Sequence, residues 1–208
     1  MAGVFICIIK MFGTKIVKNF ITDDEVKTLN KWTSDHYKEP YFIDPEMNRD
    51  DHQTRFTTRH ADLRSKDYQD YKIKYPKEVY EIQKRLIEFL NIDKKLIIPP
   101  PHFNDGIIST IAFSPGSCIK HTDGIYNNYT YTLHCNFITQ NPEHGGVTYV
   151  KGEPFETEEK DLLMYIASDL PHRVTAIEGK TPRILWVFGF FIYQHHLSHI
   201  FKPDFYSY

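Results

Sequence analysis

The chain is built around a stretch that opens with GIISTIAFSPGSCIKHTDG at residues 106–124 and closes with RILWVFGFFIY at residues 183–193. Short segments rich in β-branched and aromatic residues alternate here with turns that contain glycine or proline. This pattern is typical of an all-β sandwich or barrel. We expect strands at residues 107–113, 118–121, 129–138, 147–150, 162–166, 172–177 and 183–193.

Three side chains in this stretch could bind one metal ion. His121 and Asp123 are two residues apart, so a strand would present both on one face. His172 follows at the predicted start of a later strand. Two histidines and one carboxylate form the facial triad of non-haem Fe(II) oxygenases, which leaves coordination positions open. The spacing of His121 and Asp123 is weak evidence on its own, because the chain holds 11 histidines and an isolated one is more often structural.

Six short motifs around these residues occur in the order and spacing of one enzyme superfamily. They are Phe113-Ser114-Pro115-Gly116, His121-Thr122-Asp123, Gly145-Gly146-Val147-Thr148, Asp161-Leu162-Leu163-Met164-Tyr165, Pro171-His172-Arg173-Val174 and Gly179-Lys180-Thr181-Pro182-Arg183-Ile184-Leu185-Trp186. With them, residues 106–191 resemble the catalytic core of the Fe(II)/2-oxoglutarate-dependent dioxygenases, especially the prolyl 4-hydroxylase-like branch. The resemblance implies a mainly β (α+β) fold with a double-stranded β-helix core, the cupin-like jelly roll, and N-terminal supporting helices.

The resemblance also implies roles for individual residues. His121, Asp123 and His172 would be the catalytic iron ligands. Arg183 would bind the distal carboxylate of 2-oxoglutarate, because a buried guanidinium can hold a carboxylate with two parallel hydrogen bonds. Lys180 is a second candidate for this role, since some relatives use a lysine there. It lies beside a glycine turn, so we expect it to be solvated.

Two positions depart from the pattern of the relatives. Phe113 and Phe137 stand where many relatives have a tyrosine, and a phenylalanine cannot donate a hydrogen bond to 2-oxoglutarate. Tyr131 shares strand parity with Phe137, so we expect it to face the same cavity and assist Arg183, although a buried core tyrosine is the commoner case. Thr132 and Asn136 would then point the other way.

The implied reaction is hydroxylation of an unactivated C–H bond, with 2-oxoglutarate and O2 as cosubstrates and succinate and CO2 as products. Ascorbate is a further expected requirement. Asp123 argues against a halogenase, because relatives that transfer halide have a small residue there. Gly189 argues against a nucleic-acid demethylase, which would carry a second arginine six residues after Arg183. The expected substrate is a prolyl residue, a free amino acid or another small molecule. The alternative is a non-catalytic cupin-like protein that binds a metal or ligand without turnover.

Two helices are expected before this core. Thr22 begins a capping box with Glu25, which predicts a helix over residues 23–36. An apolar stripe at helical spacing predicts a second helix over residues 76–91. Both would support the sheet.

The segment between the helices, residues 39–75, is long, polar and rich in aromatic side chains, and it shows no period. Such segments are often lids or binding loops; a surface excursion packed by its own aromatics is an equal alternative. Arg55, Arg59 and His60 could bind an anionic substrate here, although each of them singly is more often solvated.

The length of 208 residues suits one domain with a core of its own. We divide this oxygenase domain, residues 1–208, into an N-terminal part of strand, helices and lid-like loop at 1–105, a catalytic core at 106–193 and a C-terminal tail at 194–208.

Charge and cysteine content limit the partners and the compartment. The net charge of −2 gives no sign of nucleic-acid binding. The apolar run at residues 4–9 is too short to cross a bilayer, so we expect a first strand or a leader and no membrane association. Three cysteines without a CxxC motif indicate no disulfide framework. A reducing location, the cytoplasm, is therefore expected, with a small molecule or peptide as partner; the sequence does not predict an oligomeric state.

Overall fold

The computed structural model describes residues 7–8, 12–39, 41–43, 54–58, 73–98, 105–124 and 130–202. One group of strands comprises β1 (Cys7–Ile8), β2 (Thr14–Val17), β3 (Phe42–Ile43), β4 (Arg55–Thr58), β5 (Ile107–Ala112), β7 (Thr130–Gln140), β11 (Leu162–Ile166) and β14 (Arg183–Tyr193). A second group comprises β6 (Cys118–His121), β9 (Thr148–Val150), β10 (Glu153–Phe155) and β12 (His172–Val174), while β8 (His144–Gly145) and β13 (Ile177–Glu178) form a separate pair.

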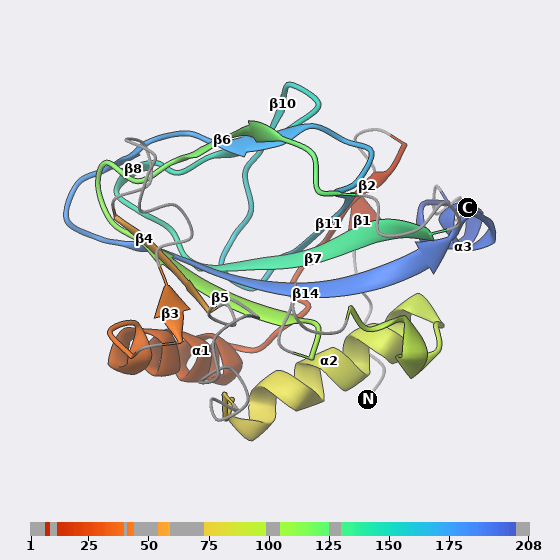
Figure 1. Ribbon diagram of the computed structural model, residues 1–208, viewed down its shortest axis with the longest axis horizontal. Coiled ribbons are helices and arrows are strands. Elements are labelled where there is room, and N and C mark those ends of the chain that lie inside the picture. The colour runs from red at the N-terminus through yellow and green to blue at the C-terminus, as the bar shows by residue number, and fades with distance from the viewer. Residues whose placement is uncertain are drawn as a thin grey trace, which may run out of the picture.

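The strands form an antiparallel jelly roll. The larger sheet has the order β1-β2-β11-β7-β14-β5-β4-β3, and the smaller sheet has the order β10-β9-β12-β6. Figure 1 shows the smaller sheet above the larger one, with two helices below. The predicted mainly β fold with a double-stranded β-helix core is thereby confirmed.

The outer face of the larger sheet carries the main apolar core. Phe137 of β7 pairs with Trp186 of β14, and both side chains are fully buried. Trp32 of helix α1 (Asp23–His36) packs on Trp186 with ring centroids 5.4 Å apart. Helix α2 (Lys77–Leu90) buries an apolar stripe against the same face, as its period predicts. The helices therefore cover one side of the sheet and leave the other side to the functional groups (Figure 1).

Both predicted helices are confirmed, and local sequence explains their ends. The Thr22 hydroxyl accepts a hydrogen bond from the Glu25 N–H, and the Glu25 carboxylate accepts one from the Thr22 N–H, so the capping box is complete. Helix α2 begins after Pro76, which cannot donate a backbone hydrogen bond. It ends at Asn91, whose left-handed conformation (φ 51°) stops the helix.

The C-terminal segment corrects one prediction. Residues 194–202 are not a tail: helix α3 (Gln194–Ile200) follows β14 directly. Its Leu197 and Ile200 are buried, and Phe201 joins them in the core. The sequence pattern was too short to show this helix.

The segment at residues 39–75 also holds more structure than its sequence predicts. Strands β3 and β4 extend the larger sheet beyond β5, with Arg55 paired to Ala112. Arg59 and His60 lie outside the described residues, as do residues 1–6 and 203–208 of the predicted first strand and tail. No helix in the described part of the chain has the length and apolar composition needed to span a membrane.

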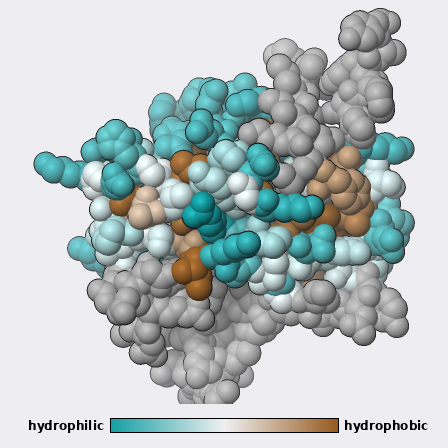
Figure 2. All heavy atoms as spheres, turned by 90° about the horizontal axis from the view of Figure 1, so that it is seen from above, coloured by the Kyte–Doolittle hydropathy of each residue, from teal (hydrophilic) through white to brown (hydrophobic). Residues whose placement is uncertain are grey.

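Figure 2 views the molecule from the side of the smaller sheet. Hydrophilic side chains dominate the visible described surface, with smaller hydrophobic patches between them. The apolar side chains that cover the helix side of the larger sheet are inside the molecule. The other face of the larger sheet, toward the smaller sheet, carries polar side chains of β7 that include Thr132, His134 and Asn136.

Candidate metal and 2-oxoglutarate site

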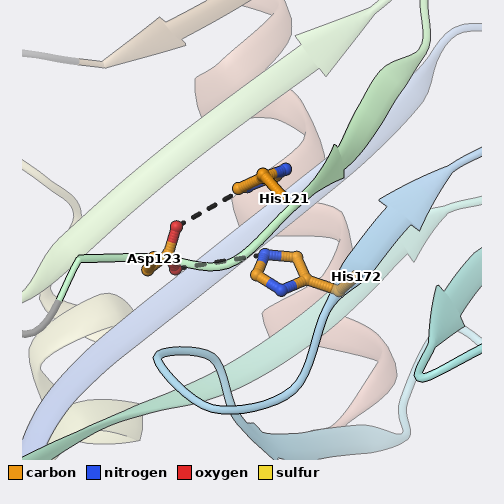
Figure 3. Close-up of side chains that lie close together, drawn as sticks. All are labelled: His121, Asp123 and His172. Atoms are coloured by element: carbon orange, nitrogen blue, oxygen red, sulfur yellow. Dashed lines mark ion pairs between the residues drawn. The ribbon is translucent and has the colours of Figure 1, made fainter.

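The three predicted metal ligands come together between the sheets. His121 ends β6 and His172 begins β12, and the register of these strands pairs the two residues directly. Asp123 lies just beyond β6, where its N–H donates a hydrogen bond to the Ala167 carbonyl at 2.9 Å. Figure 3 shows the three side chains directed toward one another. One potential ligand atom from each lies within 4.8 Å of the others.

Backbone hydrogen bonds orient both imidazoles for metal binding. His121 Nδ1 lies 2.8 Å from the Ile119 carbonyl oxygen, and His172 Nδ1 lies 3.0 Å from the Leu170 carbonyl oxygen. A carbonyl can only accept, so each Nδ1 must carry the hydrogen. In the neutral form of each ring, Nε2 is then left with its lone pair, which is the usual arrangement of a metal-bound histidine.

The separations fit a single ion. His121 Nε2 is 3.6 Å from Asp123 Oδ1, and His172 Nε2 is 4.0 Å from Asp123 Oδ2. Ligand atoms that each lie about 2.1 Å from one metal are roughly 3–4 Å apart, so small side-chain movements would bring all three to bonding distance. The side chain of His172 is 8% exposed and that of His121 is 37% exposed, so the group is anchored inside and open on one side.

The surroundings shift the pKa values of all three groups. A hydrogen bond with the Cys118 thiol raises the pKa of His121 to about 9, against the opposing effect of burial. Burial lowers the pKa of His172 to about 4. Burial would raise the pKa of Asp123, but the adjacent charge of His134 outweighs this effect and keeps the pKa of the carboxyl well below its ordinary value. Asp123 is therefore ionised, as a metal ligand must be.

His134 is a site residue that the sequence did not indicate. It lies on the inner face of β7, and its Nε2 is 2.9 Å from Asp123 Oδ2. Its ring is also 6.0 Å from that of His172. A side chain in contact with a metal-binding carboxylate fixes the orientation of that ligand. The sequence pattern that could have identified it is the alternation along β7, where Thr130, Thr132, His134 and Asn136 alternate with mostly apolar residues.

Arg183 lies on the inner face at the start of β14, buried to 4% exposure. Its Nη2 donates a hydrogen bond to Thr148 Oγ1 at 3.0 Å, whereas its Nε has no hydrogen-bond partner among the described residues. Burial lowers its pKa to about 10, so the guanidinium is still a cation at neutral pH. A buried cation without a carboxylate partner is costly unless an anion joins it. The site thus fits a carboxylate-bearing cosubstrate.

The glycine motif before Thr148 makes room for Arg183. Gly146 has φ +65°, and a Cβ there would lie 2.7 Å from Pro142 Cγ and 3.1 Å from Arg183 Cδ. Another residue at this position would be strained and would push on both neighbours. The sequence Gly145-Gly146-Val147-Thr148 therefore positions Arg183 in two ways: Gly146 leaves space for its side chain, and Thr148 accepts a hydrogen bond from its guanidinium.

Tyr131 does not face this site, which corrects the prediction made for it. On β7 it pairs with Ile192, and it packs against the main core on the same face as Phe137. The inner face instead presents Asn136, which we expected to point away, and His134 on the same side of the strand. Phe113 also packs outward, on Tyr37 and Phe56.

Tyr165 occupies the place that Tyr131 was expected to fill. It is buried on β11, its ring centroid lies 4.9 Å from that of His172, and it interacts electrostatically with Arg183. Asn136 Nδ2 donates to the Tyr165 hydroxyl at 3.2 Å. The hydroxyl keeps its own hydrogen to donate. Lys180, the second candidate for the cosubstrate, is exposed.

Known structures share this fold. The viral collagen prolyl hydroxylase of Paramecium bursaria Chlorella virus 1, in its 2-oxoglutarate complex, has a TM-score of 0.57 at 12% identity, over 86% of this chain and 96% of that one. A Trichoplax adhaerens prolyl hydroxylase, in complex with a hypoxia-inducible factor peptide fragment, has a TM-score of 0.56 at 12% identity, over 93% and 89%. HygX from Streptomyces hygroscopicus, with nickel and 2-oxoglutarate bound, has a TM-score of 0.56 at 12% identity, over 86% and 82%.

At the level of sequence, no family model matches the chain and no curated protein is found to be similar. The likeness therefore lies in the arrangement of the strands and not in overall identity. The chain has the fold of the prolyl hydroxylases and related 2-oxoglutarate oxygenases, as its motifs predict.

Proposed function

We propose that this protein is an Fe(II)/2-oxoglutarate-dependent dioxygenase that hydroxylates an unactivated C–H bond. The observation that carries the proposal is the pairing of two features on the inner face. One is a group of two histidines and one aspartate that is open on one side. The other is Arg183, a buried cation for which no carboxylate partner occurs in the described part of the chain.

His121, Asp123 and His172 would hold the iron, and His134 would keep the aspartate in place through their 2.9 Å contact. When bound, the ion supplies the oxygen chemistry that no protein side chain can perform, using 2-oxoglutarate as reductant and releasing succinate and CO2. The ligand set leaves coordination positions for the cosubstrate and O2.

Arg183 would bind the distal carboxylate of 2-oxoglutarate, assisted by two neutral hydroxyls. Thr148 already holds the guanidinium in place at 3.0 Å. Tyr165 lies in ring contact with His172 and within electrostatic reach of Arg183, so its hydroxyl can donate to the same cosubstrate. These residues also keep the anion away from water, which strengthens each hydrogen bond.

The candidate substrates are a prolyl residue in a peptide and a free amino acid or other small molecule. One structure with this fold is a prolyl hydroxylase in complex with a peptide fragment. That precedent supports a peptide substrate at the level of the fold alone. The choice between the two kinds of substrate therefore depends on the side chains that line the site in this chain.

Succinate release tests the proposal. Protein purified without oxygen would receive Fe(II), ascorbate and 2-oxoglutarate, and then O2, with and without pools of free amino acids and proline-containing peptides. We expect succinate that disappears in Asp123→Ala, whose fold and helix content are checked by circular dichroism. Tight iron binding without succinate in any pool would favour the non-catalytic cupin-like alternative.

A further inference from the structure

Arg55 is a second arginine on the inner face, and the proposed reaction does not yet use it. It begins β4 and pairs with Ala112 of β5, which in turn pairs with Arg183 of β14. The three residues lie in one row across neighbouring strands, which places the Arg55 and Arg183 backbones about 10 Å apart. Ala112 between them contributes only a methyl group. The two guanidinium groups are therefore the charged groups of this row.

The Arg55 side chain reaches from the larger sheet to the smaller one. It acts electrostatically on Cys118 of β6, whose sulfur lies 3.7 Å from Nδ1 of the ligand His121. It also acts electrostatically on Arg183. Arg55 is thus within reach of both the metal group and the cosubstrate group, and it is only partly buried. A molecule that enters from the open side would meet it.

The positive charge of Arg55 is not balanced by the other charged groups of the assembled site. Fe(II), the Asp123 carboxylate, the 2-oxoglutarate dianion and the Arg183 guanidinium together carry no net charge, and the charge of His134 beside Asp123 is a further positive one. In the part of the chain that the structure describes, Arg55 forms no ion pair with a carboxylate. A carboxylate in contact with Arg55 would form the ion pair that this side chain lacks there, with charge-assisted hydrogen bonds to the guanidinium.

We propose that Arg55 binds a carboxylate of the substrate, which is a free amino acid or a similarly small carboxylic acid. This inference rests on the proposed function, because the charge count includes iron and 2-oxoglutarate. A carboxylate supplies one negative charge and matches the guanidinium fork, whereas a phosphate group would supply roughly −1.5 to −2. An internal prolyl residue is flanked by neutral amides and offers no such group.

Binding can be measured without turnover. Protein loaded with zinc and 2-oxoglutarate would be mixed with an equimolar pool of the standard free L-amino acids, or with the same amino acids as carboxamides. Zinc accepts the same histidine and carboxylate ligands and does not react with O2. Saturation-transfer NMR identifies the compounds that bind, and their affinities are then measured in wild type, Arg55→Met, Arg55→Lys and the control Arg85→Met. Arg85 is remote, on α2, where it pairs with Glu25.

We expect one or a few free acids to bind wild type and Arg85→Met, and their carboxamides to bind at least about 10-fold more weakly. Arg55→Met should weaken the acid about 10-fold or more, and this loss should exceed any change in 2-oxoglutarate affinity by a similar factor. Arg55→Lys should restore part of the affinity. The comparison of free acids with carboxamides uses only the wild-type protein, so it tests the inference even if an Arg55 variant does not fold.

Equal binding of acids and carboxamides, or binding of neither, would overturn the inference, as would a preference for capped proline-containing peptides. Equal losses of acid and 2-oxoglutarate affinity in Arg55→Met would overturn it too, since Arg55 would then belong to the cosubstrate site. Succinate release, lost in Asp123→Ala, tests the proposed function separately. Acid binding without succinate would therefore contradict that function and leave the role of Arg55 in anion binding intact.

Discussion

Replacing Arg183 with methionine should change stability and cosubstrate binding in opposite directions. Burial, the main cause, lowers the pKa of this guanidinium from its ordinary value of 12.5 to about 10. That difference corresponds to ~3 kcal/mol against the charged form in the folded protein. Loss of the hydrogen bond to Thr148 offsets ~1 kcal/mol of it. Metal-free Arg183→Met should therefore unfold at the same urea concentration as wild type or a higher one, with a gain of up to ~2 kcal/mol.

Binding of 2-oxoglutarate should weaken strongly in the same variant. A guanidinium that holds a carboxylate with two charge-assisted hydrogen bonds contributes ~3 kcal/mol or more, so the dissociation constant should rise at least about 100-fold. Urea denaturation of the metal-free protein and calorimetric titration of nickel-loaded protein with 2-oxoglutarate measure the two effects. Arg173→Met is the matched control, because Arg173 is exposed and stacks on Tyr149 at 4.3 Å. A large loss of stability with wild-type affinity for 2-oxoglutarate would refute the reasoning.

Three further predictions concern metal binding, the cosubstrate and the core. Because the pKa of His121 is raised to about 9 and a metal must displace its proton, metal affinity should fall about tenfold per pH unit below pH 9. Cys118→Ala removes the hydrogen bond that raises this pKa, so calorimetry should find little change between pH 7 and 8 in the variant; an unchanged slope would argue against the cause given. Tyr165→Phe should weaken 2-oxoglutarate at least about 10-fold in the nickel-loaded protein, and full affinity would exclude the hydroxyl as a donor. Leu86→Ala on α2, fully buried in wild type, should lower the free energy of unfolding by about 2–5 kcal/mol, whereas the exposed Glu81→Ala should stay within about 0.5 kcal/mol; equal effects would contradict the packing described.

The parts of the fold with a strong local signal could be predicted from sequence. The strand at residues 183–193 and the helix at residues 23–36 have the predicted bounds. Both have local causes: β-branched and aromatic residues in the strand, and a capping box followed by an apolar stripe in the helix. Helix α3 has seven residues, which is too short for its period to be recognised against the preceding strand.

The face of a strand was harder to predict than the strand itself. Parity along β7 divides its residues correctly into two sets, but parity alone does not say which set faces the site. Analogy with the tyrosines of relatives selected the set of Tyr131 and Phe137. The structure shows that this set packs under the helices, and that His134 and Asn136 face the metal ligands and Tyr165. The polar character of the second set was the better guide, because an apolar set belongs in the main core.

The position of Arg55 beside Arg183 could not be predicted because it depends on strand pairing between distant parts of the chain. Arg55 lies in a segment without any period, so the sequence gives no reason to place it beside Arg183. The register of β4 on β5 and of β5 on β14 brings the two arginines into one row, although they are far apart along the chain. Such contacts depend on the whole sheet and not on the residues near either arginine.

The fate of oxygen in a single turnover tests the central claim most directly. Protein with one equivalent each of Fe(II) and 2-oxoglutarate, together with the pools of free amino acids and proline-containing peptides, would be exposed to O2 labelled with oxygen-18, and the succinate analysed by mass spectrometry. We expect succinate with one labelled oxygen atom from the wild type, and none from His172→Ala. Absence of succinate from iron-loaded wild type, or unlabelled succinate formed equally by the variant, would contradict the assignment of His121, Asp123 and His172 as the iron site of a 2-oxoglutarate-dependent oxygenase.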